Sequence, residues 1–207
     1  MAGPDSGEHL NWWTRDRDVH PRGSVEVVCG SMFSGKTEEL LRRLKRARLA
    51  RLPVVVFKPK VDQRYDAVKV VTHEGDGVSA IPVRDAAELL AELPPVGDSG
   101  RLPVVGIDEV QFFDDSIVVA CQELASRGMR VVCAGLDQDY RGLPFGPMPA
   151  LMAIAEYVTK LHAVCSRCGG EASRSQRLVA QEGQLFVGGA ATYEARCRQC
   201  FEPPALG

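Results

Sequence analysis

Residues 30–37 read Gly30-Ser31-Met32-Phe33-Ser34-Gly35-Lys36-Thr37, and this stretch decides the fold. Its spacing is that of a phosphate-binding P-loop, in which a glycine is followed by four residues and then by Gly-Lys-Thr. Gly30 and Gly35 permit backbone conformations that direct successive amides at phosphate oxygens. We expect Lys36 to reach the β- and γ-phosphates and the Thr37 hydroxyl to bind Mg²⁺. The whole stretch is therefore predicted to bind a nucleoside triphosphate with magnesium.

The residues on either side of this loop have the pattern that a P-loop requires. Ser24–Cys29 is a β-branched run and predicts a buried strand. In the segment Lys36–Arg51, apolar residues recur at helical spacing while arginines and lysines fill the other positions. A strand before the loop and a helix after it place the positive end of the helix at the phosphates. We interpret the basic residues as a solvated helix face.

Strands and helices alternate along the rest of the chain. Further strands are predicted at Val54–Phe57, Val68–Thr72, Leu102–Ile107, Arg130–Ala134 and Tyr157–Val164. Helices are predicted at Asp85–Leu93, Ser116–Arg127 and Pro149–Glu156. Such alternation favours right-handed crossovers, so we predict an α/β fold with a RecA-like, mostly parallel sheet and helices on both faces. The predicted divisions are a mobile tail at 1–23, a P-loop domain at 24–160 and a small lobe at 161–207.

An apolar strand that ends in acidic residues suggests where the magnesium would be held. Val104–Ile107 is followed by Asp108, as in a Walker B element whose carboxylate holds Mg²⁺. Glu109 comes next and is a candidate general base. Activation of water by Glu109 would make the protein an ATPase, whereas activation of a substrate hydroxyl would make it a kinase. The residues alone leave both possibilities open.

The seven cysteines divide into two kinds. Cys29, Cys121 and Cys133 lie in apolar stretches and are expected to be buried free thiols. The other four form two Cys-x-x-Cys pairs, Cys165/Cys168 and Cys197/Cys200. In a reducing compartment such pairs indicate metal rather than disulfides. Four thiolates leave no open coordination position, so we predict a structural zinc that stabilises a lobe too small for its own core.

The composition restricts the location and the partners of the protein. The formal net charge is −2 and the pI is about 6.1, so no global basic field attracts nucleic acid. The apolar runs are much shorter than the roughly 20 residues that cross a bilayer. The N-terminal residues have no apolar core of the kind that a signal peptide needs. We expect a cytoplasmic protein with no membrane or nucleic-acid partner.

Taken together, these features resemble the cytosolic, zinc-containing thymidine kinases, the type II family. Besides the P-loop and the four cysteines, the resemblance is carried in chain order by Asp62-Gln63-Arg64-Tyr65, Thr72-His73, Asp108–Phe113, Leu136-Asp137 and Arg141–Gly146. It implies that the 24–160 domain is a kinase. The reaction implied is transfer of the γ-phosphate of ATP to the 5′-hydroxyl of thymidine, with deoxyuridine as a possible second acceptor, giving dTMP and ADP in nucleotide salvage.

The resemblance also implies roles for individual residues. Glu109 is the expected catalytic base, with Lys36 and Arg64 near the transferring phosphate. The nucleoside pocket is expected to contain Met32, Asp62, Arg64, Glu109, Phe112, Leu136, Tyr140 and Phe145. A lasso loop, anchored by the zinc and running from about Ser166 to Tyr193, would close over the base. The contact positions on this loop fall on Ser175, Phe186, Gly188 and Tyr193. Feedback inhibition by dTTP and a homotetramer are also implied.

Two other functions compete with the kinase hypothesis. One is a P-loop ATPase that grips nucleic acid with its zinc-binding lobe. Several arginines of residues 161–207 favour it, but Glu171, Glu182 and Glu194 offset their charge and stacking aromatics are few. The other is a GTP-dependent switch, which the sequence argues against because it lacks the Asn-Lys-x-Asp stretch that binds guanine.

Overall fold

A six-stranded parallel sheet forms the centre of the molecule. The computed structural model describes residues 23–60, 69–71, 77–95, 100–179 and 192–203. The sheet has the order β5-β2-β6-β7-β1-β8, and every pairing in it is parallel. Its strands are β1 (Ser24–Gly30), β2 (Val54–Pro59), β5 (Ile81–Val83), β6 (Val104–Ile107), β7 (Arg130–Leu136) and β8 (Tyr157–Leu161). The predicted α/β class with a mostly parallel sheet is confirmed.

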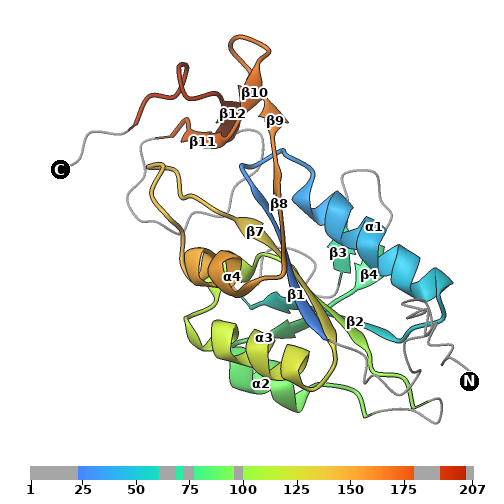
Figure 1. Cartoon of the computed structure of the whole chain (residues 1–207). Helices are drawn as coiled ribbons and strands as arrows, with labels where there is room; N and C mark the ends of the chain where they lie inside the picture. The colour runs from blue at the N-terminus through green and yellow to red at the C-terminus, as the bar shows by residue number, and fades with distance from the viewer. Residues whose placement is uncertain (1–22, 61–68, 72–76, 96–99, 180–191, 204–207) are drawn as a thin grey trace, which may run out of the picture.

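Helices cover both faces of this sheet (Figure 1). One face packs on α1 (Lys36–Leu49), and the apolar cluster there joins α1 to β1, β2, β6 and β7. The other face packs on α2 (Ala86–Ala91), α3 (Ser116–Ser126) and α4 (Met148–Ile154). Burial of both faces explains why the central residues of these strands, Val27–Cys29 of β1, Val104–Ile107 of β6 and Val131–Ala134 of β7, are apolar runs without alternating polar residues.

The P-loop helix α1 lies close against the strand that carries the acidic pair. Leu40, Leu44 and Ala47 form its buried stripe, at the spacing of one helix face. A Cβ added to Gly106 on β6 would lie only 2.8 Å from Leu44 Cδ1. Because glycine has no side chain, α1 can approach β6 at this point. This close packing sets the distance between the P-loop and the end of β6.

Beyond the main sheet, the described chain forms three small antiparallel sheets. One pairs β3 (Lys69–Val71) with β4 (Gly77–Ser79). The other two pair β9 (Ala163–Val164) with β10 (Glu171–Ala172), and β11 (Arg174–Arg177) with β12 (Tyr193–Arg196). We call residues 163–179 and 192–203 the cysteine lobe. Strand β8 runs directly from the main sheet into this lobe (Figure 1).

The structure corrects several predicted elements. The strand expected at Tyr157–Val164 is two strands, because β8 ends at Leu161 and β9 belongs to the cysteine lobe. The strand expected at Val68–Thr72 is present as β3 but pairs outside the main sheet. Strands β4 and β5 were not predicted. The segment 166–193 expected to form the lasso loop contains the short strands β10 and β11, and its residues 180–191 lie outside the described residues.

Some predicted features fall where the structure gives no description. They are the tail at 1–23 apart from its last residue, the loop with Asp62 and Arg64, and the segment with Phe186 and Gly188. Among the helices that are described, none has the length and apolar character needed to span a bilayer.

Candidate active site

The P-loop leaves the carboxyl end of β1 in a conformation that requires glycine at both of its ends. Gly30 has a φ of 147° and Gly35 a φ of 83°, both in the region that favours glycine. A Cβ on Gly30 would lie 2.3 Å from the carbonyl oxygen of Leu161 on β8. No side chain fits there. Gly35 occupies the N-cap position and directs the chain into α1.

The loop presents a row of backbone donors without internal partners. Among the described residues, none accepts a hydrogen bond from the backbone N–H groups of residues 34–37. These groups lie at the N-terminus of α1, where the helix dipole adds partial positive charge. Unpaired amides at a helix N-terminus form a site for an anionic group such as a phosphate. The geometry therefore fits the predicted phosphate-binding role.

Lys36 is folded back onto its own loop. Its Nζ donates a hydrogen bond of 2.7 Å to the carbonyl oxygen of Ser31. Burial lowers the pKa of Lys36, and the negative charges of Glu109, Asp108 and Asp137 oppose this lowering. The ammonium of Lys36 is therefore a cation beside several carboxylates. Lys36 can therefore neutralise a bound phosphate without being carried in from solvent.

Asp108 lies beside Thr37 at the end of β6, as the sequence predicts. The Thr37 hydroxyl is 3.3 Å from Asp108 Oδ2, and the backbone N–H of Glu109 donates to Asp108 Oδ1 at 3.1 Å. Burial, followed by repulsion from Glu109, raises the pKa of Asp108 to about 7. A buried carboxylate beside a hydroxyl is an oxygen donor set that suits Mg²⁺, which would supply the missing positive charge.

Glu109 occupies a left-handed backbone conformation between β6 and the 3₁₀ helix η1 (Val110–Phe112), with a φ of 51°. Its carboxylate accepts a hydrogen bond of 2.5 Å from the side-chain amide of Gln111. Gln111 Oε1 in turn accepts one of 3.0 Å from the backbone N–H of Leu136 at the end of β7. Because Leu136 N–H can only donate, the Gln111 amide has only one orientation, with its NH₂ facing Glu109. Gln111 therefore fixes Glu109 against the end of β7.

An aromatic pair borders this acidic end of the sheet. The rings of Phe112 and Phe145 meet edge to face, with centroids 5.6 Å apart and planes at 86°. Phe145 is buried, and its backbone N–H bonds to the Asp137 carbonyl at 3.2 Å. This bond ties the second aromatic to the end of β7. The pair provides an apolar wall beside Glu109, as a planar base would need.

Asp137, directly after β7, is a third carboxylate in the same region. One oxygen, Oδ2, pairs with Lys160 Nζ on β8 at 2.6 Å. The other, Oδ1, is buried and has no hydrogen-bond partner among the described residues. A buried acceptor without a partner costs free energy, so it marks a point where a donor or cation could bind.

An arginine of the cysteine lobe joins two tyrosines that the resemblance assigns to the nucleoside pocket. The Arg177 guanidinium lies over the ring of Tyr140, 3.6 Å from its centroid. Its Nε and Nη2 donate to the Tyr193 hydroxyl at 3.1 and 2.9 Å. Tyr140 belongs to the turn after β7, whereas Arg177 and Tyr193 belong to β11 and β12. The guanidinium thus joins the cysteine lobe to this turn.

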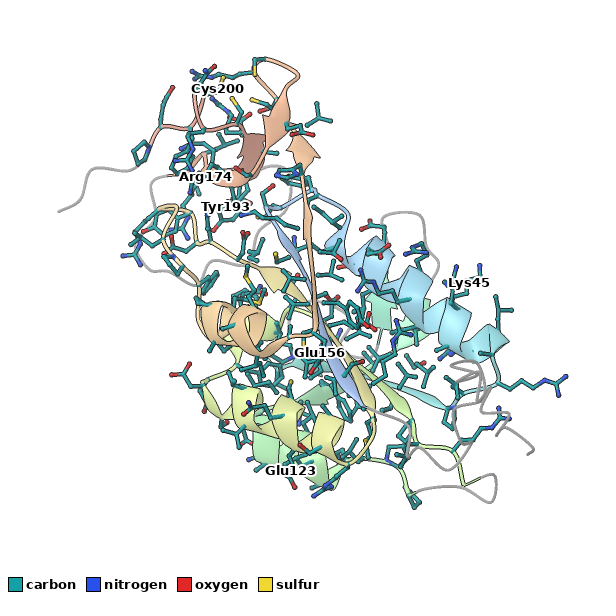
Figure 2. The ribbon with its side chains drawn as sticks, viewed as in Figure 1. Lys45, Glu123, Glu156, Arg174, Tyr193 and Cys200 are labelled. Carbon is teal, nitrogen blue, oxygen red and sulfur yellow. The ribbon has the colours of Figure 1, made fainter. Side chains whose placement is uncertain are left out.

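A second arginine strengthens the same junction. Arg174 Nη1 donates to the Gln138 side chain and, at 3.3 Å, to the Gly142 carbonyl. Its guanidinium also lies 5.8 Å from the ring centroid of Phe201. Burial lowers the pKa of Arg174. In Figure 2, Arg174 and Tyr193 lie at the base of the cysteine lobe and Cys200 lies at its far end.

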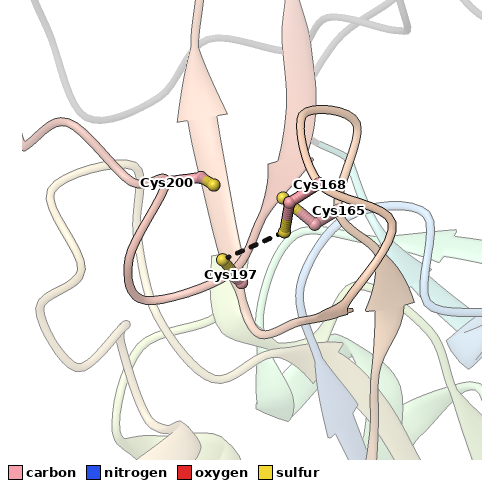
Figure 3. A group of neighbouring side chains, drawn as sticks. All are labelled: Cys165, Cys168, Cys197 and Cys200. Atoms are coloured by element: carbon pink, nitrogen blue, oxygen red, sulfur yellow. Dashed lines mark hydrogen bonds between the residues drawn. The ribbon is translucent and has the colours of Figure 1, made fainter.

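The four paired cysteines converge at that far end (Figure 3). The Sγ atoms of Cys165, Cys168, Cys197 and Cys200 lie within 4.8 Å of one another. Cys168 and Cys197 are 3.7 Å apart, close to the separation of about 3.8 Å between thiolates 2.3 Å from a tetrahedral zinc. Backbone N–H groups, that of Cys197 first, lower the pKa of Cys165 to about 6. The predicted ligand set therefore fits zinc in both spacing and chemistry.

Comparison with known proteins agrees with this geometry. The family model described as thymidine kinase matches residues 23–201. The chain belongs to the thymidine kinase family.

Individual thymidine kinases are similar over most of their length. The protein named thymidine kinase from Rhodothermus sp. (strain ITI 518) is 56% identical over 88% of this chain and 83% of its own. That of Bdellovibrio bacteriovorus is 55% identical over 89% of this chain and 88% of its own. That of Bacteroides fragilis is 48% identical over 90% of both chains.

Because the chain belongs to the thymidine kinase family, the positions of its residues can be compared with the roles that the resemblance implies for them. The structure brings Glu109, Phe112, Leu136 and Phe145 together at the ends of β6 and β7, and it joins Tyr140 to Tyr193 through Arg177. Met32 and Ser175 are hydrogen-bonded to each other. Asp62, Arg64, Phe186 and Gly188 lie outside the described residues. The roles in substrate binding and catalysis stay predictions.

Several contacts of this thymidine kinase family member were missed by sequence reasoning. Gln111, Asp137, Arg174 and Arg177 were not among the candidate site residues. Asp137 had a usable signal, because it follows an apolar strand just as Asp108 does. The two arginines carried no such signal, since arginine at those positions is also typical of a solvated strand.

Proposed function

We propose that this protein is a thymidine kinase that transfers the γ-phosphate of ATP to the 5′-hydroxyl of thymidine, giving dTMP and ADP. The observation that carries the proposal is the position of Glu109. Its carboxylate is held by Gln111, directly after Asp108 and three residues before Phe112 of the aromatic pair. A general base between a phosphate site and an apolar wall suits a hydroxyl acceptor on a planar base.

In this proposal, each step of the reaction is assigned to residues of the P-loop domain. The amides of residues 34–37 bind the triphosphate, and Lys36 neutralises its charge. Glu109 accepts the proton of the 5′-hydroxyl, and Arg64 adds charge near the transferring phosphate. Thr37 and Asp108 would hold Mg²⁺, which would supply positive charge against the phosphates.

The nucleoside is proposed to bind where the cysteine lobe meets the main sheet. Phe112, Phe145 and Tyr140 would provide apolar contacts from the sheet side, with Met32, Leu136 and Asp62 around them. Ser175, Phe186, Gly188 and Tyr193 would contact it from the lobe. Exclusion of water by this closure favours transfer to a nucleoside over hydrolysis. Structural zinc, held by Cys165, Cys168, Cys197 and Cys200, would fix the lobe in place.

A labelled-phosphate assay tests the proposal directly. The protein is incubated with γ-labelled ATP and magnesium against a panel of nucleosides, with single-stranded DNA as a separate arm. Label is expected in dTMP, with deoxyuridine as the second-best acceptor. Absence of transfer to any nucleoside, together with release of free phosphate stimulated by DNA, would contradict it. Titration of dTTP into the same assay and measurement of mass in solution test the predicted inhibition and homotetramer.

The pairing of the lobe arginines weakens the nucleic-acid alternative. Arg167 bonds to Glu202 at 2.7 Å, and Arg196 pairs with Glu194. Arg174 and Arg177 face the turn after β7 rather than solvent. Arginines engaged in ion pairs and stacking contacts are less available to a phosphodiester backbone, whose binding depends on neutralisation by Lys and Arg side chains.

A further inference from the structure

Two hydrogen bonds connect the P-loop to the cysteine lobe across most of the chain length. The backbone N–H of Met32 donates to Ser175 Oγ at 3.0 Å. The Ser31 hydroxyl donates to the carbonyl oxygen of Ala172 at 3.3 Å. Ser31, Ala172 and Ser175 are all buried, with 2%, 0% and 4% of their surfaces exposed. The Ser31 bond is therefore shielded from water, and the Met32 bond is partly shielded.

The two hydrogen bonds hold the first half of the P-loop, to which Ser34 and Lys36 are themselves bonded. They hold Ser31 and Met32, and leave the unpaired amides of residues 34–37 free for a ligand. The carbonyl of Ser31 accepts from Lys36 Nζ at 2.7 Å and from the Ser34 hydroxyl at 2.8 Å. The peptide at Ser31 is thus held by the lobe on one side and by Lys36 on the other. A shift of this peptide would move Lys36 with it.

The base of the lobe supports the loop at a third point. Gly30 pairs with Leu161, the last residue of β8, and the Leu161 carbonyl lies where a Gly30 side chain would be. Strand β8 continues directly into β9 of the lobe. The lobe and the P-loop therefore share a backbone connection as well as two hydrogen bonds, that of Ser31 buried and that of Met32 partly buried.

We infer that Ser175 is a positioning residue for the P-loop and sets the affinity for the phosphates of the nucleotide, before any nucleoside binds. This goes beyond the nucleoside contact assigned to Ser175 above, and it rests on the proposed function only in taking a nucleoside triphosphate as the donor. Without the Ser175 hydroxyl, the partly buried N–H of Met32 loses its acceptor, and the loop must rearrange or leave a polar group unpaired. A loop that is not preorganised binds its ligand less tightly.

The test measures MgADP binding in the absence of nucleoside, by calorimetry on the full chain. Ser175→Ala should raise the dissociation constant of MgADP about tenfold, which corresponds to one lost hydrogen bond. Ser175→Thr keeps the hydroxyl and should bind within about threefold of the wild type. Ser166→Ala is the matched control, since the Ser166 hydroxyl bonds only to Glu194 and Ala195 within the lobe, and its affinity should be unchanged.

The outcomes separate this inference from the nucleoside contact. If Ser175→Ala binds MgADP as the wild type does, the inference is wrong, even if the KM for thymidine rises. If Ser175→Ala does not fold, Ser31→Ala tests the same connection from the loop side, and an unchanged affinity there would also overturn it. Weaker MgADP binding in Ser175→Ala would support the inference even if the wild type transferred no phosphate to thymidine, so the two proposals fail separately.

Discussion

The main sheet and the cysteine lobe are stabilised in different ways. The main sheet is packed on both faces by large apolar side chains, and Phe57, Leu40, Leu44 and Ile107 are among its fully buried residues. The buried cluster described in the cysteine lobe consists of Ala163, Cys165, Ala172 and Ala195. Small side chains bury little apolar area, and stability from burial scales with that area. The comparison teaches that the sheet can fold on its core, whereas the lobe depends on its thiolates.

Removal of the metal should give the largest effect and should affect only one region. We expect about one zinc per chain in the purified protein. Its binding free energy in small zinc domains is about 10 kcal/mol or more, so a strong chelator should unfold the cysteine lobe. Limited proteolysis with mass spectrometry should then show cleavage within residues 163–203 while the main sheet resists. The same pattern tests the predicted domain boundary near residue 160.

Two cysteine variants make this contrast sharper. Cys197→Ser should lose zinc, because it removes one of the four converging thiols. Cys121→Ser changes a thiol buried between α3 and the main sheet and should keep its zinc. A lobe that stays resistant to protease after zinc has been removed would break the comparison.

The second prediction concerns catalysis, which the proposal assigns to the main sheet. Glu109→Gln removes the proposed base and should lower kcat about 10²- to 10⁴-fold, or roughly 3–5 kcal/mol. MgADP binding should persist, because the P-loop is unchanged; calorimetry measures this beside the labelled-phosphate assay. Glu123→Gln, an exposed position on α3, should have wild-type activity. An active Glu109→Gln enzyme would remove Glu109 from the mechanism.

The third prediction tests the apolar core of the main sheet. Leu44 on α1 is completely buried and its side chain packs against Gly106 of β6. Leu44→Ala should lower the free energy of unfolding by about 2–5 kcal/mol, through lost burial and a residual cavity. Leu49 lies on the same helix but is 77% exposed, so Leu49→Ala should change stability by less than about 0.5 kcal/mol. Denaturant unfolding measures both, and equal losses would contradict the packing described for α1.

The smallest expected effect lies at the junction of the two regions. Arg177→Gln removes the guanidinium that stacks on Tyr140 and bonds to Tyr193. A cation–π contact contributes about 0.5–2 kcal/mol, so the KM for thymidine should rise by a few-fold to about thirtyfold with little change in kcat. Arg167→Gln breaks an exposed ion pair within the lobe and should leave both constants unchanged. A fall in kcat at constant KM in Arg177→Gln would contradict a role of Arg177 in positioning the nucleoside.

Motifs with a local spacing could be predicted from the sequence. The P-loop, Asp108 with Glu109, and the two cysteine pairs each show their chemistry within a few adjacent residues. The structure then brings Thr37 to Asp108 and the four sulfur atoms to one another. The parallel strands explain why Thr37 lies near Asp108, because the carboxyl ends of β1 and β6 lie at the same edge of the sheet.

Features that depend on distant partners could not be predicted. Gln111 matters because the end of β7 lies beside β6, and Ser175 because β11 lies against the P-loop. Neither neighbour is near in sequence. Strand β5 was missed for a different reason, since Pro82 argues against a strand. Its place at the edge of the sheet explains why a proline is tolerated there.

The left-handed backbone of Glu109 has a consequence for how this protein can evolve or be engineered. A residue other than glycine in that conformation costs about 1 kcal/mol or more. The replacements that relieve the cost best, glycine and asparagine, both lack a carboxylate. A search for thermostable variants should therefore favour substitutions at position 109 that remove the proposed base. If Glu109 is the base, stability and turnover make opposite demands on this residue.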